Sequence, residues 1–151
     1  MSPSMGLLPL LSSLGRALAD FGHYHVGLVD PVLAWPCWDD GADAAEVGTR
    51  QFRGRWLGGP QLAAIAPRQR PQAGSLSDAV AGLVEYARPR CEYVLVDTSG
   101  LMPGAEDLTA LAHLDAAFVV AATHQTTERA LLARHGGLPD HQRLGVVLVS
   151  G

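Results

Sequence analysis

The sequence contains neither lysine nor asparagine, and all 11 of its basic residues are arginine. Without lysine, the chain cannot form a Schiff base with a carbonyl substrate or use a Ser-Lys dyad. It also cannot hold the β- and γ-phosphates of a nucleotide with a Walker lysine. Several classes of enzyme are therefore excluded before any motif is considered.

The chain has little positive charge to attract polyanions. Its 15 acidic and 11 basic residues give a net charge of −4 and an isoelectric point near 5.8. A chain with this balance has no general attraction for nucleic acid phosphates or anionic lipids. We therefore expect no nucleic acid partner.

Long apolar runs and cysteine motifs are absent as well. Apolar stretches such as 116–122 are far shorter than the ~20 residues that a membrane span requires. Arg16 follows the first apolar run instead of preceding it, which argues against a secretory signal. Cys37 and Cys91 lack the spacing of a zinc site or a disulfide framework. These absences predict a cytoplasmic protein with no metal and no disulfide.

The order of apolar segments predicts one α/β domain over residues 1–151. Leucines recur every three or four residues from 5 to 21, as on one face of a helix. The further expected elements are strands over 25–30, 62–65, 93–97, 116–122 and 144–149, and helices over 77–87, 106–113 and 126–137. An irregular segment is expected at about 31–60. Strands that alternate with helices indicate a mostly parallel sheet flanked by helices, and the lack of alternation in 116–122 indicates a strand buried on both faces.

Two of the expected strands end in an acid, at Asp30 and at Asp97. Ligands of open parallel sheets bind beyond the carboxyl ends of the strands, where both carboxylates are expected. Asp97 and Thr98 after an apolar strand have the form of a Walker B segment, in which a carboxylate positions a magnesium-bound water beside nucleotide phosphates. The alternative role of Asp97 is to cap the turn that follows it.

Six segments in order together resemble ParA/MinD-type ATPases, most of all the branch of bacterial polysaccharide-associated tyrosine kinases. The segments are the expected helix at 7–21, HVGLVD (25–30), YVLVDTSG (93–100), LTALAHLDAAFVVAA (108–122), TTERALL (126–132) and LGVVLV (144–149). By position, Asp30 matches the acid after the second strand of that family, and Asp97 matches the Walker B acid. Asp115 matches an acid before the fourth strand, which we interpret as a helix-end feature. The resemblance implies a P-loop NTPase-like fold and a nucleotide and magnesium site at Asp30, Asp97 and Thr98.

The departures from that family are as informative as the match. The family begins with a strand and a glycine-rich loop that contains lysine, and this sequence shows neither. Val149 stands where the family has an asparagine that meets the base. Ser99 and Gly100 replace two prolines, which resembles the DTSG segment of signal-recognition GTPases. We therefore predict a degenerate member in which the first strand and phosphate loop are missing and the nucleotide site is vestigial.

Two functions follow from this prediction. The first is a noncatalytic regulatory or structural subunit, without a cofactor, that binds an active ATPase relative or a membrane-associated complex. The alternative is an ATPase- or GTPase-like enzyme that uses Asp30 and Asp97 and takes its phosphate contacts from arginine or from a partner chain. Loss of the phosphate loop favours the first, because catalysis in this class is mostly positioning and electrostatic stabilisation.

The absence of a first strand predicts oligomerisation. In the family that strand lies centrally, beside the Walker B strand, so its loss leaves two inner strands with unpaired edges. The sheet can re-pair in a changed order, a partner or second copy can supply a strand, or the start can lie upstream. Edge pairing predicts a homo- or hetero-oligomer.

All three tryptophans fall within the irregular segment, close to several arginines. Tryptophan and arginine dominate interface hot spots, so Trp35, Trp38, Arg53 and Trp56 are candidate interface residues. The equal alternative is a second small core under a long loop. Other candidates are weaker: His23 and His25 lack a third metal ligand, and Cys91 is expected to be buried and inert.

Overall fold

The structure is a computed structural model that describes residues 3–38, 46–72, 74–98, 111–122, 126–138 and 140–149. The chain divides into two compact units, Met1–Ala110 and Leu111–Gly151. Within the described ranges, no helix has the length and apolar character needed to cross a membrane.

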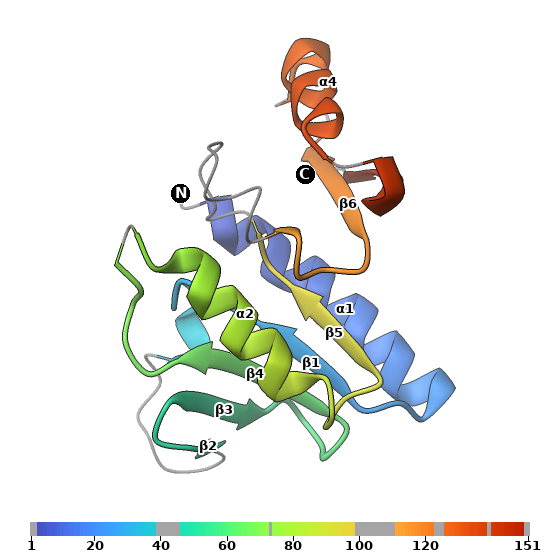
Figure 1. The fold of residues 1–151 in the computed structure, drawn as a ribbon. Helices are drawn as coiled ribbons and strands as arrows, with labels where there is room; N and C mark the ends of the chain where they lie inside the picture. Colours follow the sequence, from blue (N-terminus) through green and yellow to red (C-terminus); the bar gives the residue numbers. More distant parts are fainter. Residues whose placement is uncertain are drawn as a thin grey trace. The chain divides into compact units, whose positions relative to one another are not determined.

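The first unit contains a five-stranded sheet between two helices (Figure 1). Its elements are α1 (Pro3–Gly22), β1 (Val26–Val29), the short helix η1 (Pro36–Trp38), β2 (Glu46–Gly48), β3 (Phe52–Trp56), β4 (Leu62–Pro67), α2 (Leu76–Ala87) and β5 (Tyr93–Val96). The strand order is β2-β3-β4-β1-β5. β1 is parallel to β4 and β5, whereas β3 is antiparallel to both β4 and β2.

The sheet is therefore mixed, and the expectation of a mostly parallel sheet holds in this unit only for β4, β1 and β5. The segment expected to be irregular supplies the antiparallel strands β2 and β3. The short turn at 57–61 explains the direction of β3, because only antiparallel neighbours can be joined by so few residues. Gly58 in this turn has a φ of +75°, a conformation that glycine adopts without strain.

Opposite faces of the sheet carry separate cores. On one face, α1 contributes Ala19, which packs with Val26 and Leu28 of β1. Gly15 lets α1 approach closely, because a Cβ there would lie 2.9 Å from a methyl group of Leu62. On the other face, Leu83 and Ala87 of α2 pack with Val29 and Ile65. The N-cap residue of α2 is Ser75, two residues before the expected start of this helix at 77, and its side chain makes no capping hydrogen bond.

The second unit contains the parallel pair β6 (Ala117–Ala122) and β7 (Arg143–Val149), with α4 (Glu128–Gly136) and the short helix η2 (Asp140–Gln142). The Thr127 hydroxyl accepts a hydrogen bond from the Ala130 N–H at 3.2 Å and thereby caps the N-terminus of α4. Burial of β6 on both faces was a wrong expectation, because the Phe118 side chain is 54% exposed. The helix expected over 106–113 lies largely outside the described residues.

Candidate functional site

Asp30 and Asp97 lie side by side at the carboxyl ends of two adjacent parallel strands. Val29 of β1 is paired with Val96 of β5, so the residues that follow them are neighbours. The Asp30 N–H donates to the Ile65 carbonyl and the Asp97 N–H donates to the Val29 carbonyl, both at 2.9 Å. The two carboxyl groups are almost inaccessible, with exposed fractions of 1% and 4%. The direct parallel pairing of β1 with β5 thus brings both acids together, whereas the sequence predicted only that both lie at the carboxyl ends of strands.

Their hydrogen-bond partners are tryptophan N–H groups. Oδ2 of Asp30 accepts from the Trp35 backbone N–H at 2.8 Å and from the Trp38 indole at 2.9 Å. Oδ2 of Asp97 accepts from the Trp35 indole at 3.0 Å. Trp35 therefore bridges the two acids. We call Asp30, Trp35, Trp38 and Asp97 the carboxylate–indole cluster.

The local sequence explains how the tryptophans reach the acids. Pro31 follows Asp30 immediately and cannot donate a ladder hydrogen bond, so the chain leaves the sheet there. Leu33 has a φ of +55°, a left-handed conformation that turns the chain back. Pro36 then begins η1, which positions Trp38. Trp35, whose backbone N–H donates to Asp30 and whose indole donates to Asp97, thus lies five positions after Asp30 in the chain.

The acids and the indole rings of the cluster are buried together. Trp35 is 1% exposed and Trp38 is 8% exposed. One carboxylate oxygen, Oδ1 of Asp30, is buried and has no hydrogen-bond partner among the described residues. Among the residues that the structure describes, no three carboxylate, histidine or cysteine side chains gather as a metal site would require. Thr98 is half-buried and takes part in none of the hydrogen bonds of the cluster.

Two arginines of β3 contact the short helix η1. The Arg53 guanidinium lies 5.2 Å from the centre of a Trp38 ring and donates to the Trp38 carbonyl at 3.3 Å. Arg55 donates to the Cys37 carbonyl. Because Arg53 and Arg55 are two residues apart on a strand, they share one face of the sheet. The alternate spacing of the two arginines in the segment RGR is a sequence signal from which the shared position of Arg53 and Arg55 on one face could have been predicted.

The predicted interface residues separate into two groups. Trp35 and Trp38 are buried in the core on the α1 face of the sheet, together with Ala19 and Leu28, so they neither line a surface nor form a separate small core. Trp56 is 40% exposed and Arg53 is half-buried. Only Trp56 and Arg53 therefore remain candidates for partner contact.

The weaker candidates have structural roles. Glu92 accepts a hydrogen bond from the His25 backbone N–H at 2.6 Å, which lowers the pKa of the Glu92 carboxyl, and its side chain lies 3.5 Å from the His25 ring. Cys91 is half-buried, and burial raises the pKa of its thiol, which makes it a poor nucleophile at neutral pH. Asp115 is exposed in the second unit, and Ser99 lies outside the described residues.

These features define an α/β fold with a mixed sheet between helices and two buried acids at the carboxyl ends of its parallel strands. A solved structure described as "BceF Tyrosine Kinase Domain" has a similar fold, with a TM-score of 0.65 and 20% sequence identity. The similarity covers 99% of this chain but only 65% of that chain, so this chain spans about two thirds of its length. No family model and no curated protein match the sequence.

Proposed function

We propose that this chain is a noncatalytic protein that acts through protein–protein interaction, as a regulatory or structural subunit of a larger assembly. One observation carries the proposal. Oxygens of both acids that would serve a nucleotide site accept hydrogen bonds from Trp35 and Trp38, whose rings are buried with them. A magnesium-bound water would have to displace these donors.

The missing phosphate-binding groups support the same proposal. Phosphoryl transfer depends on groups that clamp the phosphates and neutralise their charge. The chain has no lysine for this task. The described arginines nearest the cluster, Arg53 and Arg55, donate to the backbone of η1 instead. Acids without a phosphate clamp do not bind Mg·ATP tightly.

Nucleotide titration tests this proposal. Calorimetry with Mg·ATP and with Mg·GTP is expected to show no saturable binding at millimolar nucleotide, because both acids are already bonded and covered. Micromolar binding that weakens in Asp97→Ala would contradict the proposal. That result would instead support the ATPase- or GTPase-like alternative with Asp30 and Asp97 as ligands of magnesium.

The side of β5 that faces away from β1 supports a strand as the means of partner binding. The N–H groups of Tyr93 and Asp97 donate to carbonyls of His25 and Val29, on the side of β1. Alternate residues of a strand direct their backbone groups to opposite sides, so Val94 directs its N–H and C=O away from β1. Within the first unit, no described strand pairs with that side. A strand edge whose N–H and C=O groups point outward can serve as a template for another strand.

Val94→Pro tests edge pairing directly. Light scattering of the unmodified protein is expected to give a dimer or larger species, and Val94→Pro is expected to give a monomer, because proline removes the outward N–H but none of the bonds to β1. Val94→Thr retains the N–H and is the matched control. Circular dichroism should be similar for all three proteins. A monodisperse, folded monomer of the unmodified protein would refute edge pairing.

A further inference from the structure

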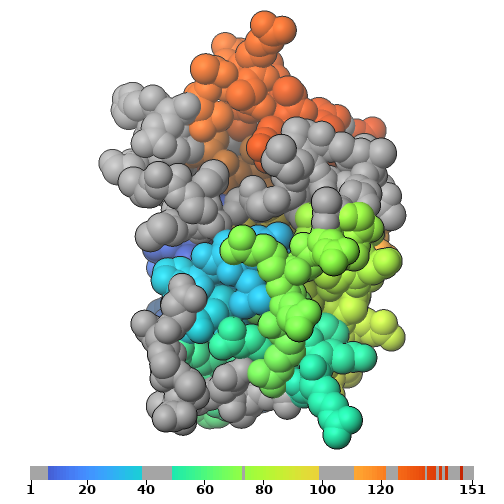
Figure 2. Space-filling view, turned by 90° about the vertical axis from the view of Figure 1, so that its left-hand side faces the viewer, coloured from blue at the N-terminus to red at the C-terminus, as the bar shows by residue number. Residues whose placement is uncertain are grey.

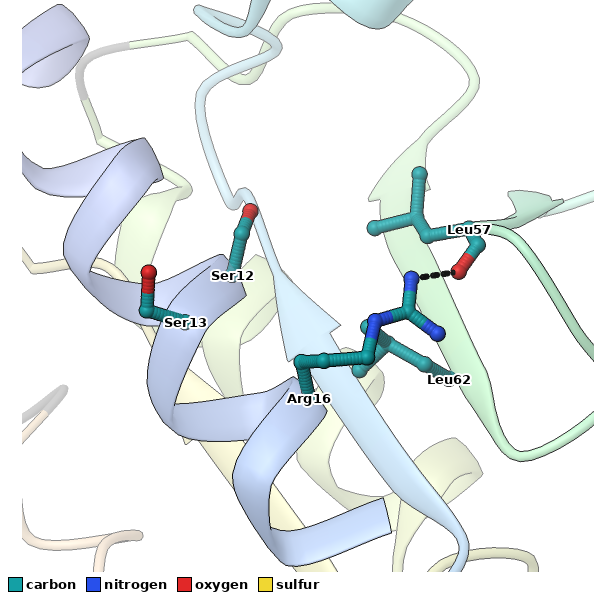
Figure 3. A pocket seen from close by; sticks show the side chains of 5 residues that line it. All are labelled: Ser12, Ser13, Arg16, Leu57 and Leu62. Carbon is teal, nitrogen blue, oxygen red and sulfur yellow. Dashed lines mark hydrogen bonds between the residues drawn. The ribbon is translucent and has the colours of Figure 1, made fainter. Parts of the chain in front are cut away.

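A cavity of about 350 Å³ opens between α1 and the end of β3 (Figure 3). It is lined by Ser12, Ser13 and Arg16 of α1, by Leu57 after β3 and by Leu62 of β4. A volume of this size is within the range of small-molecule sites. None of the lining residues belongs to the carboxylate–indole cluster.

The Arg16 guanidinium is fixed across this cavity. Its Nη2 donates to the Leu57 carbonyl, as the dashed line in Figure 3 shows. It also packs against the turn, since a Cβ on Gly58 would lie 2.9 Å from Nη2. The loss of side-chain freedom that a ligand would otherwise impose on arginine has therefore already occurred on folding.

The polar lining is made of donors and carries one positive charge. A guanidinium has five N–H donors, and the bond to Leu57 uses one of its nitrogens. No carboxylate lines the cavity, and Arg16 forms no ion pair with any acid in the part of the chain that the structure describes. The hydroxyls of Ser12 and Ser13 lie on the preceding turn of the same helix (Figure 3). The apolar remainder is Leu57 and Leu62.

We propose that this cavity binds a small molecule that carries an oxyanion, a carboxylate or a phosphate ester, next to a short apolar group. The oxyanion accepts hydrogen bonds from Arg16 and from the serine hydroxyls, because charge-assisted bonds to a guanidinium are the strongest that this lining offers. The apolar group lies against Leu57 and Leu62. This ligand site goes beyond the proposed protein–protein function and does not depend on it.

Nuclear magnetic resonance titrations of the full chain test the proposal, with inorganic phosphate and sodium butyrate as probes and sodium chloride as the ionic-strength control. Saturable shifts of the Arg16 Nε–Hε and of the Ser12 and Ser13 amides are expected with one of the two probes, and the one that binds identifies the class of oxyanion. Binding is expected to weaken about tenfold in Arg16→Gln, which removes the charge. Arg129→Gln, at an exposed position of α4, is the matched control and should bind as the unmodified protein does.

Arg16→Gln can also loosen the turn that it holds, so a second variant is needed. Ser12→Ala combined with Ser13→Ala leaves the Leu57 contact in place and is expected to weaken binding several-fold. Absence of saturable shifts with both probes would overturn the proposal. Equal affinity in the unmodified protein and in the serine double variant would overturn it as well.

Discussion

Trp35→Ala is expected to lower the free energy of unfolding by about 3–5 kcal/mol, the range for removal of a large buried aromatic side chain. Among the described residues, Trp35 has the largest fully buried side chain. The substitution leaves a cavity in the α1 face of the core and removes the indole donor of Asp97. Urea denaturation followed by circular dichroism measures the change.

Trp35→Phe separates the hydrogen bond from the packing. Phenylalanine retains most of the apolar surface but leaves the buried Asp97 oxygen without its indole donor, for an expected loss of about 1–3 kcal/mol. Trp56→Phe is the control, because Trp56 is 40% exposed and should change stability by less than about 0.5 kcal/mol. Equal effects of the two substitutions would show that the indole bond to Asp97 contributes nothing.

Asp30→Ala is the second substitution with a large expected effect. It leaves two buried donors, the Trp35 backbone N–H and the Trp38 indole N–H, without their shared acceptor. Each unsatisfied buried group costs about 1–3 kcal/mol, so a loss of about 2–5 kcal/mol is expected in the same denaturation assay.

Two further variants check the reason for this loss. Asp30→Asn keeps one acceptor oxygen and should recover part of the stability. Asp20→Ala, at an exposed position of α1, should have little effect. If Asp30→Ala were no more destabilising than Asp20→Ala, the cluster would not stabilise the fold, and the main support for a closed acid site would be lost.

The parallel strands and their acids could be predicted from the sequence because the signals are local. An uninterrupted apolar run such as 93–96 or 26–29 is typical of a strand in a parallel sheet, and the acid that follows marks its carboxyl end. The sequence placed both acids at the carboxyl ends of strands, and only the observed register of β1 with β5 made Asp30 and Asp97 neighbours.

The segment from 31 to 60 could not be assigned in the same way. Its strands β2 and β3 are short, and their apolar residues lack a sustained period. Their pairing depends on the turn at Gly58 and on contact with β4. Such pairing becomes favourable only when the neighbouring strand is in place, so no local pattern reveals it.

The amino-acid sequence by itself determined that this chain has no lysine for a phosphate site and that its parallel strands end in two acids. Only the tertiary structure decided what those acids do. Burial of a carboxylate is costly unless donors satisfy it, and here the donors are N–H groups of tryptophans that the sequence left equally open to an interface or a core. The turn of the chain after Pro31 determines which tryptophan N–H group donates to Asp30 and which donates to Asp97. That turn depends on three-dimensional packing and not on any local sequence pattern.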